Sequence, residues 1–372
     1  MPALRFTVHR HDGAARTGLL ALTHGVVETP TFMPVGTLAT VKGLTVDMLH
    51  GAGARIILGN TYHLTLRPGD ELIAELGGLH RFMNWSGPIL TDSGGYQVFS
   101  LATQRKITDA GAVFKSHIDG SKLYLTPEKA VEIQQNLGSD IAMVLDECPP
   151  ADDDPANIRV AVRRSIFWAE RCKTHHTRAD QAQFAIVQGG LDIALRGECA
   201  KELVAMDFPG YALGGFSVGE SPDKMHAALP DCAAMLPGEK PRYLMGVGRP
   251  EDLLAGVAAG IDLYDCVMPT RNGRNATAFT DHGVVKLRNA RHKRDPGPVM
   301  SGCGCDCCRH YSRAYLNHLF HADEMLGPTL LSLHNVHYYL DLMARARQAI
   351  HEGRFAAFRT AMVAQWRGES VD

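Results

Sequence analysis

The sequence predicts an α/β protein built on an irregular (β/α)8 barrel of the TIM type, and two observations carry this expectation. Seven short apolar runs recur between residues 55 and 271, and helix-like segments such as ANIRVAVRRSIFWAERCKTHH at 156–176 lie between them. Strands that are apolar without alternation are buried on both faces, as in parallel sheets. Seven strand–helix units favour a closed barrel over a doubly wound open sheet.

Each apolar run ends in a polar or glycine-rich cluster. The runs are RIILGNTYH (55–63), PILTDSGGYQ (88–97), IAMVLDEC (141–148), FAIVQGG (184–190), YALGGFSVGE (211–220), RYLMGVG (242–248) and IDLYDCVMPTR (261–271). Because the C-terminal ends of barrel strands meet at one mouth, the polar residues there should converge. These residues are Asn60, His63, Asp92, Asp146, Gln188, Gly215 and Asp265. A lone Asp at such a junction is explained by a helix N-cap or a turn, but three of them favour a shared site.

The remaining parts of the chain differ in character. Residues 1–270 are expected to hold an N-terminal sheet and most of the barrel. Within them, residues 6–37 read as short strands with glycine turns that form an antiparallel sheet closing one end of the barrel. Residues 271–334 are basic and contain a cysteine cluster, which predicts a separate metal-binding subdomain. Residues 335–372 continue a helical apolar period and are expected to pack on the barrel.

Composition and cysteine usage narrow the class of protein. With 45% hydrophobic and 21% charged residues, the chain has the composition of a folded soluble protein. No apolar run has the length of a signal peptide or of a membrane span, so a cytoplasmic location without membrane contact is expected. Of the nine cysteines, five are single and four lie in CGCDCC, which is typical of a metal site rather than of disulfides.

The cysteine cluster has the spacing of a structural zinc site. Cys303, Cys305 and Cys308 form C-x-C-x-x-C, a loop that can hold one tetrahedral ion and needs a fourth ligand. A filled ligand shell makes such an ion structural rather than catalytic. Spacing alone does not exclude Cys307 in place of Cys308, nor does it choose the fourth ligand among His310, His318, His321, His334 and His337.

Although the net charge is only −2, one segment is strongly basic. Residues 271–294 contain a single acid, Asp281. Their basic residues are Arg271, Arg274, Lys286, Arg288, Arg291, Lys293 and Arg294. Such a segment is often just a solvated face, but beside a barrel mouth it suits a polyanionic substrate bound through its phosphates.

The expected carboxylates at the mouth suggest chemistry at a glycosidic bond. Asp92 and Asp265 could act as a pair, one attacking the anomeric carbon and the other moving the proton of the leaving group. Asp146 could instead read the N–H donors of a guanine base, because an ionised carboxylate only accepts hydrogen bonds. Tyr96 and Met245 suit the faces of a flipped base.

Seven ordered motifs then resemble a known family nearly from end to end. TDSGGYQ, DEC, VQGG, GGFSVGE, YLMGVG, DCVMPTR and CGCDCC with a later HN are similar to the bacterial tRNA-guanine transglycosylases, also called queuine tRNA-ribosyltransferases. The resemblance implies an irregular (β/α)8 barrel with an attached zinc subdomain. It also implies that one structural Zn²⁺ is held by Cys303, Cys305, Cys308 and His334, and that no redox or nucleotide cofactor is required.

The resemblance also implies a reaction. Asp265 would be the nucleophile that attacks ribose C1′ and forms a covalent tRNA intermediate, with Asp92 as general acid and base. The exchange would replace guanine at the wobble position of tRNAs with a G-U-N anticodon by preQ1, a step of queuosine biosynthesis. Asp146, Gln188 and the Gly215 backbone would bind the polar groups of the base.

Further positions follow from the same likeness. Tyr96 and Met245 would cover the faces of the base, and Val218 fits the bacterial preference for preQ1. Arg271 and Arg274 would contact tRNA. The chain departs from the family at Phe216, where leucine is usual and which is expected to act through its backbone carbonyl as a pocket wall. It departs again at Ala276, which replaces a usual glycine and is awkward if the position needs a positive φ.

Three alternatives remain beside this interpretation. The first is a catalytically silent tRNA-binding partner subunit, which the presence of both Asp92 and Asp265 disfavours. A glycoside hydrolase on the same barrel would show more aromatic platforms than 7% aromatic residues suggest. An archaeosine-type relative would need additional C-terminal RNA-binding domains. A homodimer is expected from the family alone.

Overall fold

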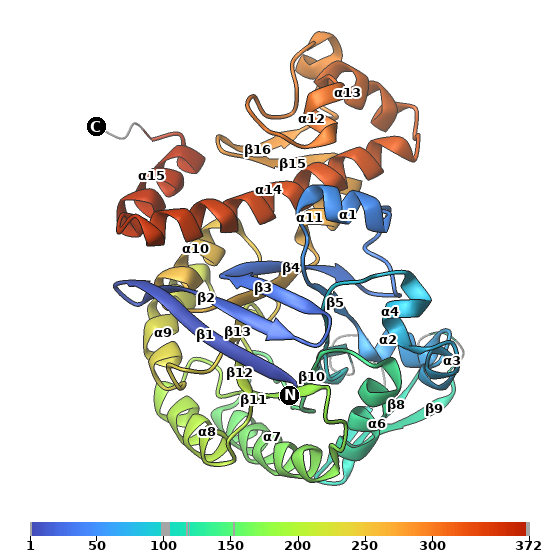
Figure 1. The fold of residues 1–372 in the computed structure, drawn as a ribbon, viewed down its shortest axis with the longest axis vertical. Coiled ribbons are helices and arrows are strands. Elements are labelled where there is room, and N and C mark those ends of the chain that lie inside the picture. The colour runs from blue at the N-terminus through green and yellow to red at the C-terminus, as the bar shows by residue number, and fades with distance from the viewer. Residues whose placement is uncertain (1, 98–104, 117, 119, 152, 370–372) are drawn as a thin grey trace.

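Eight parallel strands close into a barrel in the computed structural model, which describes residues 2–97, 105–116, 118, 120–151 and 153–369 (Figure 1). The strands are β4 (Thr31–Gly36), β5 (Ile57–Gly59), β6 (Ile89–Thr91), β10 (Ile141–Met143), β11 (Ala182–Val187), β12 (Gly210–Leu213), β13 (Arg242–Leu244) and β14 (Leu263–Cys266). Side chains in these strands are almost all buried, as expected for strands covered on both faces. The predicted fold class is confirmed.

Helices surround the barrel. They are α1 (Val46–Ala52), α2 (Thr61–Leu66), α3 (Asp70–Glu75), α4 (Gly78–Met83), α6 (Pro127–Leu137), α7 (Pro155–His175), α8 (Ile193–Ala205), α9 (Pro222–Ala234), α10 (Pro250–Ala258), α14 (Leu326–His351) and α15 (Phe355–Arg367). Local signals explain where they begin. Asp154 caps α7 by accepting from the Ala156 N–H, and Asp192 caps α8 by accepting from the Leu195 N–H, which satisfies donors that a helix start leaves free.

The N-terminal stretch divides between two sheets, which corrects the expectation of a single antiparallel sheet over 6–37. Strands β1 (Leu4–Asp12), β2 (Ala15–Leu22) and β3 (Gly25–Thr29) do form that sheet. Strand β4 instead pairs in parallel with β14 and β5 and closes the barrel. The physical difference is visible in burial: β1 alternates at first between half-buried and exposed residues, whereas every residue of β4 is buried.

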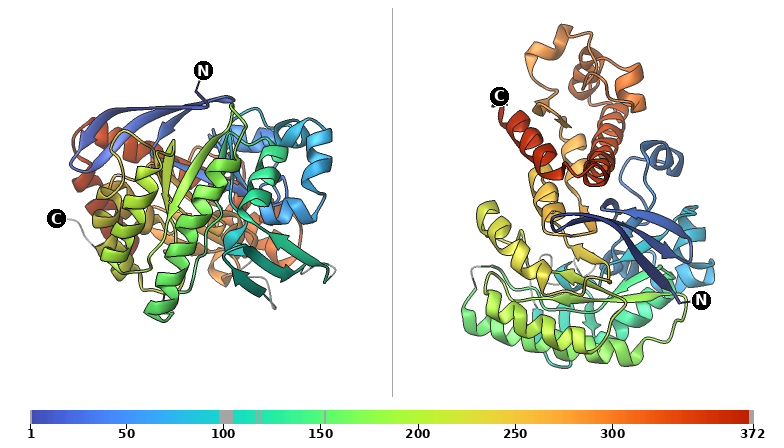
Figure 2. Two further views of the ribbon diagram at one scale, coloured as in Figure 1. Left: turned by 90° about the horizontal axis from the view of Figure 1, so that it is seen from below. Right: turned by 60° about the vertical axis from the view of Figure 1, so that its left-hand side comes forward.

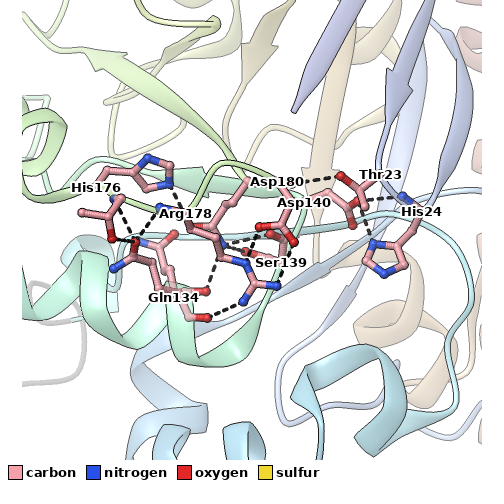
Figure 3. Close-up of polar contacts among 11 residues, drawn as sticks. Thr23, His24, Gln134, Ser139, Asp140, His176, Arg178 and Asp180 are labelled. Carbon is pink, nitrogen blue, oxygen red and sulfur yellow. Dashed lines mark hydrogen bonds and ion pairs between the residues drawn. The ribbon is translucent and has the colours of Figure 1, made fainter. Parts of the chain in front are cut away.

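The antiparallel sheet covers the end of the barrel where the strands begin (Figure 1). Arg16 of β2 reaches Asp262, the residue before β14, with Nε–Oδ1 and Nη2–Oδ2 distances of 3.0 and 2.5 Å. Both side chains are buried, and Asp262 also accepts from the Arg242 N–H. Figure 3 shows a second link, in which the turn between β2 and β3 donates from His24 to Asp140, the residue before β10.

A second antiparallel sheet follows β6 and was not predicted. It consists of β7 (Arg105–Thr108), β8 (Gly111–Lys115) and β9 (Lys122–Leu125). It projects from the opposite end of the barrel to the β1–β3 sheet (Figure 2). Because it is inserted after the C-terminal end of a barrel strand, it lies on the side of the mouth.

A subdomain is inserted after β14 and α11 (Met268–Arg274). It contains β15 (Thr277–Thr280), β16 (Gly283–Lys286), the short 3-10 helix η1 (Ala290–Arg294), α12 (Asp306–His310) and α13 (Arg313–His321), around its own apolar cluster. Helix α14 then runs without interruption along the subdomain and the barrel (Figure 1). The domain limits at 270 and 334 stay predictions. None of the helices in the described ranges has the length and apolarity to cross a bilayer.

We expect Arg16→Ala to lower the free energy of unfolding by about 3–5 kcal/mol, because it leaves the Asp262 carboxylate buried without its charged partner. Urea denaturation followed by circular dichroism measures the change. The matched control is Arg159→Ala, which removes an exposed ion pair with Glu198 and should cost less than about 1 kcal/mol. Equal losses in the two variants would contradict this account.

Candidate active site and metal centre

Asp92 lies directly after β6, buried at the mouth of the barrel. Its Oδ2 atom accepts from Asn60 Nδ2 at 2.6 Å and Gln97 Nε2 at 2.8 Å, and its Oδ1 atom accepts from the Thr61 N–H at 2.7 Å. Burial, with a smaller contribution from the charge of Asp265, raises the pKa of Asp92 to about 6 despite these donors. Asp92 can therefore exchange a proton near neutral pH.

Asp265 lies within β14 and is held from one side. Its Oδ1 atom accepts from the Tyr243 hydroxyl at 2.6 Å and the Gly246 N–H at 2.7 Å. Burial raises the pKa of Asp265, and the two donors oppose this shift. Burial raises the pKa of Tyr243, and the charges of Asp265 and Asp92 both add to this shift. The structure thus brings the two predicted carboxylates together.

Asp146 follows β10 and forms a second polar cluster. Its carboxylate accepts from Gln188 Nε2 at 2.7 Å and Ser93 Oγ at 3.2 Å. Burial raises the pKa of Asp146 to about 6, and these donors oppose the shift. Within the described ranges the Oε1 atom of Gln188 is buried without a hydrogen-bond partner. A Cβ added at Gly215 would lie 2.4 Å from this atom, and the φ of +68° at this position also favours glycine.

The other predicted pocket residues have different surroundings. Phe216 is buried, and its ring centroid lies 3.9 Å from the Arg196 guanidinium carbon. The Val218 N–H donates to the Glu220 carboxylate at 3.0 Å. Met245 is partly buried against the core, whereas Tyr96 is 52% exposed. The stacking roles of Tyr96 and Met245 stay predictions.

The predicted tRNA contacts lie immediately after the Asp265 strand. Helix α11 carries Arg271, which is exposed, and Arg274, which is half-buried with an unpaired Nη1 atom among the described residues. Burial lowers the pKa of Arg274, and the charge of Arg271 lowers it as well. Ala276, which follows this helix, has a φ of +58°. The position where the family usually has glycine therefore adopts the left-handed conformation, which is unfavourable for alanine.

The cysteine cluster and a histidine of α14 form a compact ligand group. The Sγ atoms of Cys303, Cys305 and Cys308 lie 3.7, 3.5 and 3.3 Å from the Nδ1 atom of His334. His334 donates its Nε2–H to the Phe279 carbonyl at 2.8 Å, which leaves the lone pair of Nδ1 facing the sulfurs. These four residues could hold one metal ion.

The geometry separates these four residues from the other candidate ligands, although His337 also contacts Cys303, and the ligand assignment stays a prediction. Cys307 is buried in the apolar cluster of the subdomain instead of joining the group of four. His310, His318, His321 and His337 are likewise outside that group. Three thiols and one imidazole are one of the donor sets that structural zinc sites use.

A second group of possible ligands lies at the other end of the barrel. His24 and His80 both contact the Asp140 carboxylate, at 2.9 and 3.1 Å, beside a cavity of about 280 Å³. Their rings are stacked 3.6 Å apart at 18°. Lone pairs lying in two nearly parallel planes do not meet at one ion, so this group acts as a hydrogen-bonded link between the sheet and the barrel.

Sequence reasoning missed three side chains of the site: Tyr243, Gln97 and Ser93. Each donates a hydrogen bond to one of the predicted carboxylates. Tyrosine, glutamine and serine are too common in proteins for one such residue to indicate a functional site. A signal existed only for Tyr243. It lies two residues before Met245 in the apolar run RYLMGVG, and residues two apart in an extended run share a face.

Comparison with known proteins agrees with this architecture. A sequence model of the queuine tRNA-ribosyltransferase family matches residues 12–368. Proteins named queuine tRNA-ribosyltransferase are similar over nearly the whole chain. The one from Solidesulfovibrio magneticus is 56% identical, covering 96% of this chain and 97% of its own length, and the one from Pelotomaculum thermopropionicum is 52% identical, covering 99% and 100%. The chain therefore belongs to the queuine tRNA-ribosyltransferase family.

Proposed function

We propose that this protein exchanges guanine at the wobble position of G-U-N tRNAs for preQ1 by double displacement. The observation that carries the proposal is the pair of carboxylates, Asp92 and Asp265, in different environments at one mouth. A silent partner subunit would have no use for this pair. The basic helix α11 directly after Asp265 supports a polyanionic substrate.

The environment of Asp265 suits a nucleophile. Tyr243 and Gly246 both bond to Oδ1, so Oδ2 is the oxygen that attacks ribose C1′. A C1′–O bond forms as the C1′–N9 bond breaks, and the base leaves with a proton taken from Asp92. The incoming base returns its N9 proton to Asp92, attacks C1′ and releases Asp265. Two inversions retain the configuration at C1′.

The Asp146 cluster suits the base. An ionised Asp146 accepts from the N1–H and exocyclic amine of guanine or preQ1. The unpaired Gln188 Oε1 and the backbone at Gly215 offer further polar groups. Phe216 and Val218 would line the wall beside the 7-substituent, and Tyr96 and Met245 would cover the faces of the ring.

The metal would be one structural Zn²⁺ on Cys303, Cys305, Cys308 and His334. The donor set and the orientation of His334 by Phe279 support this assignment. No position of that ligand shell remains for substrate. The family likeness also supports tRNA contacts by Arg271 and Arg274, a cytoplasmic location, and a homodimer, which sedimentation of the purified protein tests.

Base exchange itself can be measured with radiolabelled guanine and an unmodified G-U-N tRNA. We expect label to enter acid-precipitable RNA and unlabelled preQ1 to suppress its incorporation. A tRNA with a different anticodon is the control. Absence of incorporation, with tRNA still bound, would favour the silent partner subunit.

Asp265→Asn should lower the exchange rate by at least about 10³-fold, because an amide does not form the covalent intermediate. The intermediate is seen as a tRNA–protein adduct on denaturing gels, and the variant should show none. Asp207→Asn, at an exposed carboxylate remote from the mouth, is the matched control. An Asn variant with normal activity would sink the nucleophile assignment.

Guanine affinity should fall as the pH drops through about 6, the raised pKa of Asp146. Above this pKa the carboxylate is ionised and accepts two N–H bonds, whereas below it one acceptor becomes a donor. Calorimetric titration with guanine across pH 5–8 measures the effect. Asp146→Asn should bind weakly with little pH dependence, and a wild-type affinity independent of pH would contradict the assignment.

Cys305→Ser should lose the bound metal and reduce stability, because folding of such a site is coupled to its ion. Atomic absorption gives the metal content and thermal denaturation the stability. Cys307→Ala is the control, since this buried neighbour is outside the ligand group. Equal metal content in all three proteins would show that the ion is bound elsewhere.

A further inference from the structure

Arg196 is an arginine in an unusual place. It is fully buried in the first turn of α8, where the positive end of the helix dipole disfavours a cation. No carboxylate bonds to it among the described residues. The charge of Glu220 acts on it only from a distance, and that carboxylate bonds to the Ser217 and Val218 N–H groups. A buried unpaired charge is costly, so its contacts need an explanation.

The guanidinium joins two loops at the mouth of the barrel. Its Nε donates to the Gly190 carbonyl at 2.7 Å and its Nη1 to the Val187 carbonyl at 3.2 Å, both at the end of β11. Its Nη2 donates to the Gly214 carbonyl at 2.9 Å, at the end of β12. Phe216, from the second loop, covers the guanidinium face.

These two loops carry the polar groups of the base pocket. Gln188 lies between the Val187 and Gly190 carbonyls that Arg196 binds, and Gly215 lies between Gly214 and Phe216. The packing is close: Gly189 has a φ of +146°, and a Cβ there would lie 2.7 Å from Arg196 Cγ. Three directed bonds therefore set the distance between the two walls of the pocket.

We propose that Arg196, supported by the ring of Phe216, is the positioning residue that holds the two walls of the base pocket at the spacing a guanine-type base needs. The inference rests on the proposed base exchange. Arg196 does not touch the base and takes no part in the chemistry. Its planar fork, rather than its charge alone, is the property required, because a lysine ammonium does not reach three carbonyls in this geometry.

The test compares Arg196→Lys, Arg196→Met and Phe216→Leu with the wild-type holoprotein in guanine exchange. Arg196→Lys should raise KM for guanine by about tenfold or more while KM for tRNA and the saturated kcat change little, since misplacement of binding groups weakens binding. Arg196→Met should have a larger effect and Phe216→Leu a smaller effect of the same kind. Arg16→Lys, at a buried arginine of the opposite barrel end, controls for general destabilisation.

Hydrogen exchange of the backbone separates the inference from the proposed function. Arg196→Met should speed exchange in residues 187–190 and 214–218 together, and the Arg16 variant should not. If hydrogen exchange is faster in both loops of Arg196→Met but the wild-type protein incorporates no guanine, Arg196 still holds the two loops and the base-exchange proposal is overturned. Normal incorporation with an unchanged KM for guanine in Arg196→Lys and Arg196→Met would overturn the positioning role alone.

Discussion

Closure of the barrel depends on the pairing of β4 with β14. These strands are separated by more than two hundred residues, yet Thr31 to Pro34 lie in register with Leu263 to Cys266. Strand β14 carries Asp265, and the residue before it, Asp262, binds Arg16 of the covering sheet. The seam therefore fixes the N-terminal sheet at one end of the barrel and the candidate nucleophile at the other. Without it, β6 and β14 would not place their carboxylates at one mouth.

In the two polar clusters of the mouth, burial raises the pKa of a carboxyl group and hydrogen bonds oppose that rise. Asp92 and Asp146 are both buried, and burial raises the pKa of each to about 6. Their donors differ: Asp92 is held by Asn60, Thr61 and Gln97, and Asp146 by Gln188 and Ser93. Similar pKa values thus arise with different donors: two side-chain amides and a backbone N–H at Asp92, and one side-chain amide and a hydroxyl at Asp146.

Much of the barrel was predictable because its signal is local. Apolar runs ending in polar residues located seven of the eight strands, and strand-end geometry predicted that Asp92 and Asp265 converge. Strand β4 was assigned to the wrong sheet, since glycine turns dominate its neighbourhood and pairing partners leave no local trace. The same limit hid the β7–β9 sheet. Arg196 was missed because its sequence context is that of an ordinary exposed helical arginine.

Two adjacent residues of α14 divide their contacts between the subdomain and the active strand. His334 faces the three thiols, while Asn335 donates to the Pro269 and Thr277 carbonyls and accepts from the Phe279 N–H. Pro269 lies in the first turn of α11, the helix that carries Arg271 and begins three residues beyond Asp265. The group of residues that could hold a metal ion and helix α11 are therefore joined through two adjacent residues of α14. Because α14 is one uninterrupted helix, a displacement of His334 would be passed on through Asn335 to the first turn of α11.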